Sequence, residues 1–192
     1  MLFALLLCAG TGCTVTFGIS KAINAQFPEV KLKTPRSAGI KIGLARVEDS
    51  RNTREVNEGS NQIPLLAGPE FYEFIDHTFR NRLIQRGFDP TDALDPTKTL
   101  LLQPYKTMVV TLQSVSFVCN GMFSCDGTSN VSLAMQVFAP DRSAIFSGSF
   151  EGQSNQNDRL DAGIANVNII AKAAERAIDA AFANPKFEAA LK

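Results

Sequence analysis

Three strand-like runs follow one another between positions 107 and 150, and they constrain the fold more than any other feature of this sequence. In the middle run, every second residue is apolar, which is the period of a strand with one buried face. These residues are Val131, Leu133, Met135 and Val137. A run rich in Val and Thr, 107–119, precedes it, and a third run follows the turn at 139–142. Consecutive strands joined by short turns pair with one another, so the sequence predicts an antiparallel meander.

In the first run, 107–119, the apolar residues expected to face the core change their alternation partway along the strand. Met108, Val110 and Leu112 alternate, and the alternation then resumes one residue out of step at Val115 and Phe117. An extra residue in one strand of an antiparallel pair has this effect, so we expect a β-bulge between Leu112 and Val115.

One helix is predicted before these strands in the sequence and a second one after them. In 69–86, Phe71, Ile75, Phe79 and Leu83 recur every four residues, with Pro69 suited to the first turn and Gly87 to the end. The second helix, 161–183, has one long apolar face and stops at Asn184-Pro185, which leaves Phe187 and Leu191 on a final short turn.

A further strand is predicted at 39–48, where Ile40, Ile42 and Leu44 alternate before the turn at 49–52. The stretch 89–99 is rich in turn residues, and 100–103 is predicted as a short strand. The expected fold class is therefore α+β: an antiparallel sheet, made of one N-terminal strand and the three-strand meander, packed on one face by two helices.

The N-terminus predicts export. Residues 2–7 form an apolar run too short to span a bilayer but of the length of a signal-peptide core. The following Ala9-Gly10-Thr11-Gly12-Cys13 resembles a bacterial lipobox, in which the cysteine receives a lipid and becomes the mature N-terminus. An ordinary cleaved signal peptide and a buried N-terminal strand are the alternatives. The position after this cysteine is occupied by Thr14 and not by the Asp that retains such proteins in the inner membrane. We therefore expect Cys13 to be anchored in the outer membrane, on its periplasmic face.

The chain accordingly divides into a signal peptide (1–12), a lipidated N-terminus with an extended tether (13–37) and a single α+β domain (38–192). The tether lacks periodicity and contains Pro28 and Pro35. A solvated linker is the favoured interpretation, with strand docking onto a neighbouring protein as the other.

Cys119 and Cys125 flank a short loop between two predicted strands. In an oxidising compartment such a pair forms a disulfide, which we predict here in preference to a metal site or free thiols. Met122 and Phe123 lie at the tip of this turn, either as a partner-binding element or folded back onto the sheet. Tyr72 and Phe74 widen the apolar arc of the first helix, and we expect a partner to cover them.

Evidence for catalysis or nucleic-acid binding is weak. The chain has 19 basic and 19 acidic residues and lacks the cationic field of nucleic-acid binders. Its one histidine, His77, has Asp76 and Glu73 near it, but adjacent helical residues diverge by about 100°, so a solvated surface histidine is expected. Asp49 and Arg51 are interpreted as a turn cap and a salt bridge. We predict no enzyme activity, no catalytic residue, no cofactor and no metal.

The strand ending in Asp49-Ser50-Arg51, the helix ending in 83–88, the meander and the terminal 187–191 together resemble the YajG family of bacterial outer-membrane lipoproteins. The resemblance implies a periplasm-facing, lipid-anchored α+β module whose partners are other envelope proteins. Two functions remain open at this point. One is a structural or assembly subunit of an envelope machine such as a secretion system or motor, and the other is a monomeric module that binds a lipid, glycan or peptide between helix and sheet.

Overall fold

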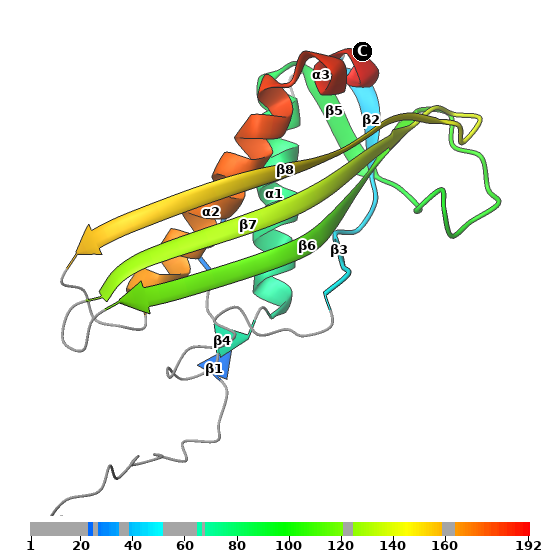
Figure 1. Ribbon diagram of the computed structural model, residues 1–192. Coiled ribbons are helices and arrows are strands. Elements are labelled where there is room, and N and C mark those ends of the chain that lie inside the picture. The colour runs from blue at the N-terminus through cyan, green and yellow to red at the C-terminus, as the bar shows by residue number, and fades with distance from the viewer. Residues whose placement is uncertain are drawn as a thin grey trace, which may run out of the picture.

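The computed structural model describes residues 23–24, 27–34, 39–51, 65–66, 68–120, 125–158 and 164–192. Its centre is a six-stranded sheet in the order β5-β2-β6-β7-β8, with the short strand β3 also paired to β6. The helices α1 and α2 lie side by side on one face of this sheet (Figure 1). A separate two-residue pair joins β1 (Ile23–Asn24) to β4 (Leu65–Leu66).

The predicted meander is confirmed. It consists of β6 (Lys106–Asn120), β7 (Cys125–Phe138) and β8 (Ala144–Asp158), all antiparallel. The register between β6 and β7 shifts between Leu112 and Ser114, where the change of parity predicts a bulge. As a result Leu112 and Val115, on either side of the shift, are both buried on the inner face.

The other half of the sheet is parallel, which corrects the all-antiparallel prediction. β2 (Ile40–Leu44), α1 (Pro69–Gln85) and β5 (Phe88–Asp92) form a strand–helix–strand unit in which the two strands pair in parallel. β2 and β3 (Glu48–Asp49) also run parallel to β6. The start of the stretch interpreted as turn-rich is thus a strand. It accommodates Pro90 because β5 is the edge of the sheet, where a missing N–H costs no ladder hydrogen bond.

The helices supply the other half of the core. The predicted stripe of α1 is fully buried, and Gly87 ends the helix with φ of 84°. α2 (Ile164–Ala183) crosses the inner faces of β7 and β8. It approaches β8 so closely that a Cβ on Gly152 would overlap backbone atoms of Ala173 and Ala177.

The chain ends in α3 (Pro185–Leu191), which packs over the end of the sheet. The Asn184 side chain caps it by accepting hydrogen bonds from the amides of Lys186 and Phe187. Phe187 and Leu191 are completely buried, and the Phe187 ring contacts the ring of Phe182 at 5.4 Å between centroids. The final short turn predicted for these two residues is a seven-residue helix.

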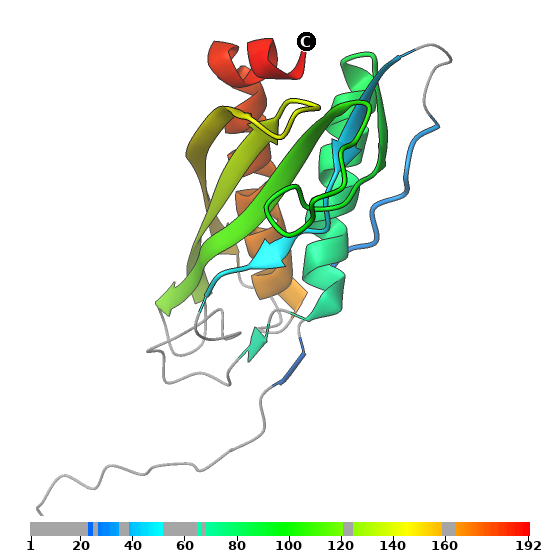
Figure 2. The ribbon, with the colours of Figure 1, turned by 90° about the vertical axis from the view of Figure 1, so that its right-hand side faces the viewer.

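Part of the predicted tether lies against the domain. Residues 27–34 form no helix or strand but run alongside α1 (Figure 2). The Phe27 ring stacks on Phe71 with 4.4 Å between centroids. Asn81 accepts a hydrogen bond from the Lys33 amide at 2.8 Å and donates one to the Lys31 carbonyl at 2.9 Å. This segment is therefore an ordered strap on α1 rather than a solvated linker.

The same contact corrects the interpretation of His77. Its Nδ1 donates to the Val30 carbonyl at 2.9 Å, and the side chain is half-buried. Asp76 beside it is held by Arg80 in an ion pair of 2.7 Å. His77 thus fastens the strap to α1 instead of facing solvent.

Candidate functional site

The loop between β5 and β6 crosses β2 on the face opposite α1. We call residues 93–105 the leucine loop. Gly43 permits the crossing, since a Cβ at that position would come within 2.6 Å of the Ala93 Cβ and 2.8 Å of the Tyr105 Cε2. The Ala93 amide donates to the Leu44 carbonyl at 3.1 Å, so the loop joins the end of β2 as it leaves β5.

Hydrogen bonds within the loop hold its shape. Asp95 Oδ1 accepts from the amide and the hydroxyl of Thr97, at 2.8 and 2.7 Å. Gln103 Nε2 donates to the Leu94 carbonyl at 2.7 Å and closes the loop across its base. Lys98 pairs with Glu48 of β3 and fixes the loop to the sheet. The backbone is therefore ordered without a hydrophobic core of its own.

The four leucine side chains of this loop are exposed to solvent. Leu100, Leu101 and Leu102 are 85%, 65% and 69% exposed, and Leu94 is 52% exposed. The segment 100–103 is not a strand, contrary to the sequence prediction, because Pro104 follows it and no neighbouring strand pairs with it among the described residues. Four clustered exposed leucines on an ordered loop are typical of an interaction site.

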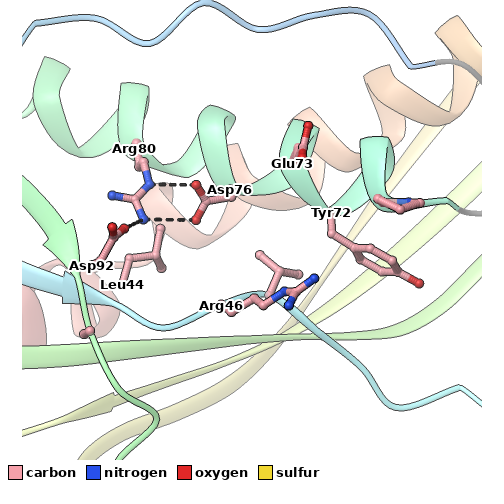
Figure 3. Close-up of a pocket in the computed structure, with 10 residues that line it drawn as sticks. Leu44, Arg46, Tyr72, Glu73, Asp76, Arg80 and Asp92 are labelled. Carbon is pink, nitrogen blue, oxygen red and sulfur yellow. Dashed lines mark hydrogen bonds and ion pairs between the residues drawn. The ribbon is translucent and has the colours of Figure 1, made fainter.

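A cleft of about 380 Å³ lies on the other face of β2, beneath α1. It opens where the parallel strands β2 and β5 end, and one face of α1 forms its wall (Figure 3). Crevices at the carboxyl ends of parallel strands are the usual ligand sites of open sheets that carry helices. Its lining includes Leu44 and Val47 from the floor, Pro69 and Tyr72 from the helix, and five charged residues.

Three of those charged residues are bound to one another. Arg80 bridges Asp76 and Asp92, with nitrogen–oxygen distances of 2.7 Å to each. Burial alone would lower the pKa of the Arg80 guanidinium, but the two carboxylates outweigh it and raise the pKa above its ordinary value. This end of the cleft is thus a fixed, charged wall.

Arg46 and Glu73 are different, because neither makes a hydrogen bond or ion pair with the part of the chain that the structure describes. Arg46 lies between the buried residues Ala45 and Val47 in the link from β2 to β3, and it is itself exposed. Figure 3 shows its guanidinium between floor and helix, on the side of Tyr72, with Glu73 on the helix above.

A structural cluster borders the cleft. Asp49 accepts hydrogen bonds from Arg51 Nε at 2.9 Å and from the Tyr72 hydroxyl at 2.6 Å. Burial alone would raise the pKa of Asp49, but these bonds outweigh it and hold the pKa below its ordinary value of 3.8. The interpretation of Asp49 and Arg51 as a cap and salt bridge is confirmed, with Tyr72 as an additional partner that the sequence did not indicate.

The structure places the predicted partner-binding residues in different settings. Phe74 is only 3% exposed and lies beside Phe27 of the strap, so the wide apolar arc of α1 is covered in part by the chain itself. Cys13, Met122 and Phe123 lie outside the described residues. Cys119 and Cys125 occupy the ends of β6 and β7, but their side chains are not described, so the disulfide stays a prediction.

Sequence reasoning missed both the exposed leucines and the cleft. The signal for the loop is the unalternating run Leu100-Leu101-Leu102 between Pro96 and Pro104. No comparable signal exists for the cleft, because only tertiary folding brings Arg46 and Asp92 to the charged residues of α1.

Two general observations limit the chemistry of the described residues. They contain no group of three or more His, Cys, Asp or Glu side chains arranged to hold a metal ion. None of their helices has the length and apolar character needed to cross a membrane.

Comparison with known proteins finds no matching family model and no matching curated protein. Among solved structures, the chain shows distant similarity to bacterial lipoproteins and related proteins. Protein XCC0632 from Xanthomonas campestris has a TM-score of 0.48 at 14% identity, covering 88% of this chain and 93% of that one.

Lipoprotein GNA1162 from Neisseria meningitidis has a TM-score of 0.41 at 10% identity, over 66% of this chain and 90% of that one. A PelC dodecamer from Paraburkholderia phytofirmans has a TM-score of 0.38 at 12% identity, over 74% and 91%. Likeness at this level concerns only the course of the backbone.

Proposed function

We propose that this protein is a non-enzymatic lipoprotein of the cell envelope, and that it docks onto another protein of a larger assembly through the leucine loop. In this proposal Cys13 carries the lipid in the outer membrane, and the domain faces the periplasm. The resemblance of the sequence to the YajG-like lipoproteins belongs to the same proposal. The observation that carries it is the cluster of four exposed leucines on an ordered loop.

The loop is suited to docking because it is already ordered. Hydrogen bonds at Asp95, Thr97 and Gln103 fix its backbone, so binding costs little additional conformational entropy. A partner that covers Leu100–Leu102 gains apolar burial of roughly 25 cal/mol for each Å² removed from water. Such burial supplies binding energy without any change in the fold.

A protein partner fits this loop better than a membrane surface does. Its one cation, Lys98, is already paired with Glu48, and Asp95 offsets the charge. Loops and helices that bind anionic lipid surfaces carry several free lysines or arginines beside their apolar residues. An apolar groove on a neighbouring envelope protein therefore matches the chemistry of the loop.

Met122 and Phe123 are a second proposed contact. The ends of β6 and β7 that flank them lie at the opposite end of the sheet from the leucine loop (Figure 1). Contacts at both ends of one long meander would place the protein between two neighbours in an assembly.

The test replaces Leu100, Leu101 and Leu102 with Ser in the full-length protein and measures two quantities, the melting temperature and co-purification after mild detergent extraction. The matched control replaces three exposed apolar residues elsewhere, Ile40, Val118 and Ile145, with Ser. Each exposed substitution should change the free energy of unfolding by only about 0.5 kcal/mol.

We expect the wild type and the control variant to co-purify in a stoichiometric high-mass assembly, and the loop variant to be extracted alone with a nearly unchanged melting temperature. Assembly of the loop variant at the wild-type level would contradict docking through this loop. A wild-type protein that is extracted alone with a bound small molecule would favour the binding-module function instead.

A further inference from the structure

The cleft under α1 goes beyond the proposed docking function and lies on the opposite face of β2 from the leucine loop. Its position follows from the topology. β5 and β6 flank β2 on its two sides, so the chain leaves β2 toward α1 on one face and returns to β6 through the leucine loop on the other. The carboxyl end of β2 therefore faces the space under the helix, which is the ligand position of open parallel sheets.

The lining determines the class of ligand. Five of the ten lining residues are charged, namely Arg46, Glu73, Asp76, Arg80 and Asp92. A lipid chain would remove all five charges from water and leave Arg46 and Glu73 without a partner, which is costly, so the cleft does not suit an acyl group. The volume of about 380 Å³ is at the small end of ligand sites and suits a molecule of dipeptide size.

The two unpaired charges specify the ligand further. The Asp76–Arg80–Asp92 wall satisfies its own charges, apart from one net negative charge, so Arg46 and Glu73 are the groups left for a ligand. A guanidinium binds a carboxylate with two parallel hydrogen bonds. The surrounding carboxylates repel a multiply charged anion such as phosphate, but they attract an ammonium group carried by the same ligand.

We propose that this cleft binds a small zwitterion, an amino acid or short peptide whose carboxylate pairs with Arg46 and whose ammonium group lies toward Glu73. The half-buried Tyr72 ring forms the adjoining wall, with its hydroxyl already held by Asp49. Arg80 takes no part in binding directly and positions the acidic wall.

The probe is L-alanyl-L-alanine, titrated into the full-length protein in detergent and followed by calorimetry. Two relatives of the probe each lack one charge: N-acetyl-alanyl-alanine has no ammonium group, and alanyl-alanine amide has no carboxylate. We expect saturable binding of the zwitterion and about tenfold weaker binding of either relative, since each has lost a charged hydrogen bond.

Arg46→Gln should weaken binding of the zwitterion about tenfold and abolish the preference of the protein for the zwitterion over the amide. Glu73→Gln should abolish the preference for the zwitterion over the acetylated form. Both residues are exposed, so the melting temperature should not change. The matched controls are Lys41→Gln and Glu151→Gln, which remove exposed charges outside the cleft lining. Both control variants should bind the zwitterion as the wild type does.

Failure of the wild type to bind the zwitterion saturably overturns the proposal, as does equal binding by the Arg46→Gln variant. The variant with three serines in the leucine loop should bind the dipeptide normally. Loss of assembly in that variant and loss of dipeptide binding in the Arg46 variant therefore separate the two proposals.

Discussion

At the scale of single residues, the cluster of Asp49, Arg51 and Tyr72 joins three parts of the fold. Asp49 ends β3, Arg51 follows it, and Tyr72 belongs to the first turn of α1. The carboxylate accepts from both partners and is only 18% exposed, so it ties the start of the helix to the sheet. Its hydrogen bonds need the ionised form, which makes this link dependent on pH.

We expect Asp49→Asn to lower the free energy of unfolding at pH 7 by about 1–3 kcal/mol, because it removes charged hydrogen bonds. The native pKa of Asp49 lies below its ordinary value of 3.8. Its stabilising contribution is therefore complete above that value and is lost as the pH falls through the lower native pKa. The difference between wild type and variant should shrink below pH 4.

Urea denaturation at pH 7, 5, 4 and 3 measures this difference. Glu73→Gln serves as the control, because it removes a carboxylate that has no hydrogen-bond or ion-pair partner among the described residues. A difference for Asp49→Asn that stays constant down to pH 3 would argue against a depressed pKa.

At the scale of elements, the packing of α2 on β8 depends on a glycine. Gly152 faces the helix backbone directly, and side chains such as Phe150 on the same strand face fill the space beside it. The sequence indicates that β8 and α2 both contribute apolar faces. It does not indicate where the helix comes closest to the strand, because that point depends on the crossing of two elements.

Gly152→Ala should destabilise the protein by about 3 kcal/mol, since the new Cβ overlaps α2 backbone atoms that cannot move independently. The control is Gly148→Ala on the same face of β8, where the Cβ would come within 2.9 Å of the Phe146 ring. A side chain can rotate away, so we expect about 1 kcal/mol there. Thermal or urea unfolding compares the two, and equal costs would show that α2 shifts to accommodate the methyl group.

The elements that the sequence predicted well are those whose pattern is local. Helix α1 has an apolar residue at every fourth position, and β7 alternates from Val131 to Val137. The bulge at Leu112 shows as a break in the alternation of β6. β5 was missed because Pro90 and two aspartates resemble a turn, and only its pairing with β2 makes it a strand. The parallel half of the sheet and the cleft that it forms depend on contacts between distant segments, which no local period records.

At the scale of the whole molecule, the strap 27–34 joins the N-terminal region to the domain. Phe27 covers the apolar arc of α1, His77 holds Val30, and Asn81 holds the backbone on either side of Leu32. Asn81 itself is 8% exposed. The strap therefore contacts the domain from within 13–37, the range predicted from the sequence to be a tether.

Asn81→Ala should release this strap without unfolding the domain. It removes two hydrogen bonds to backbone groups that water can reach, so we expect a loss of only about 1 kcal/mol in global stability. The Lys33 amide, which donates a hydrogen bond to Asn81 in the wild type, should exchange its hydrogen much faster in the variant. Hydrogen exchange followed by mass spectrometry of 27–34 measures this. Gln85→Ala, an exposed change on the same helix, is the control. Unchanged protection in the Asn81 variant would mean that Phe27 and His77 hold the strap without Asn81.

Under the proposed lipid anchor, the strap would also limit how far the domain can stand from the membrane. If the lipid is on Cys13, a free chain as far as residue 37 has 24 links and would span roughly 80 Å when fully extended, at 3.3–3.6 Å per residue. The chain is already fastened at Phe27, which leaves 14 links and a span of roughly 50 Å. With the lipid on Cys13, the domain would be confined to a layer within that distance of the bilayer, where the local concentration of any partner anchored in the same leaflet is high.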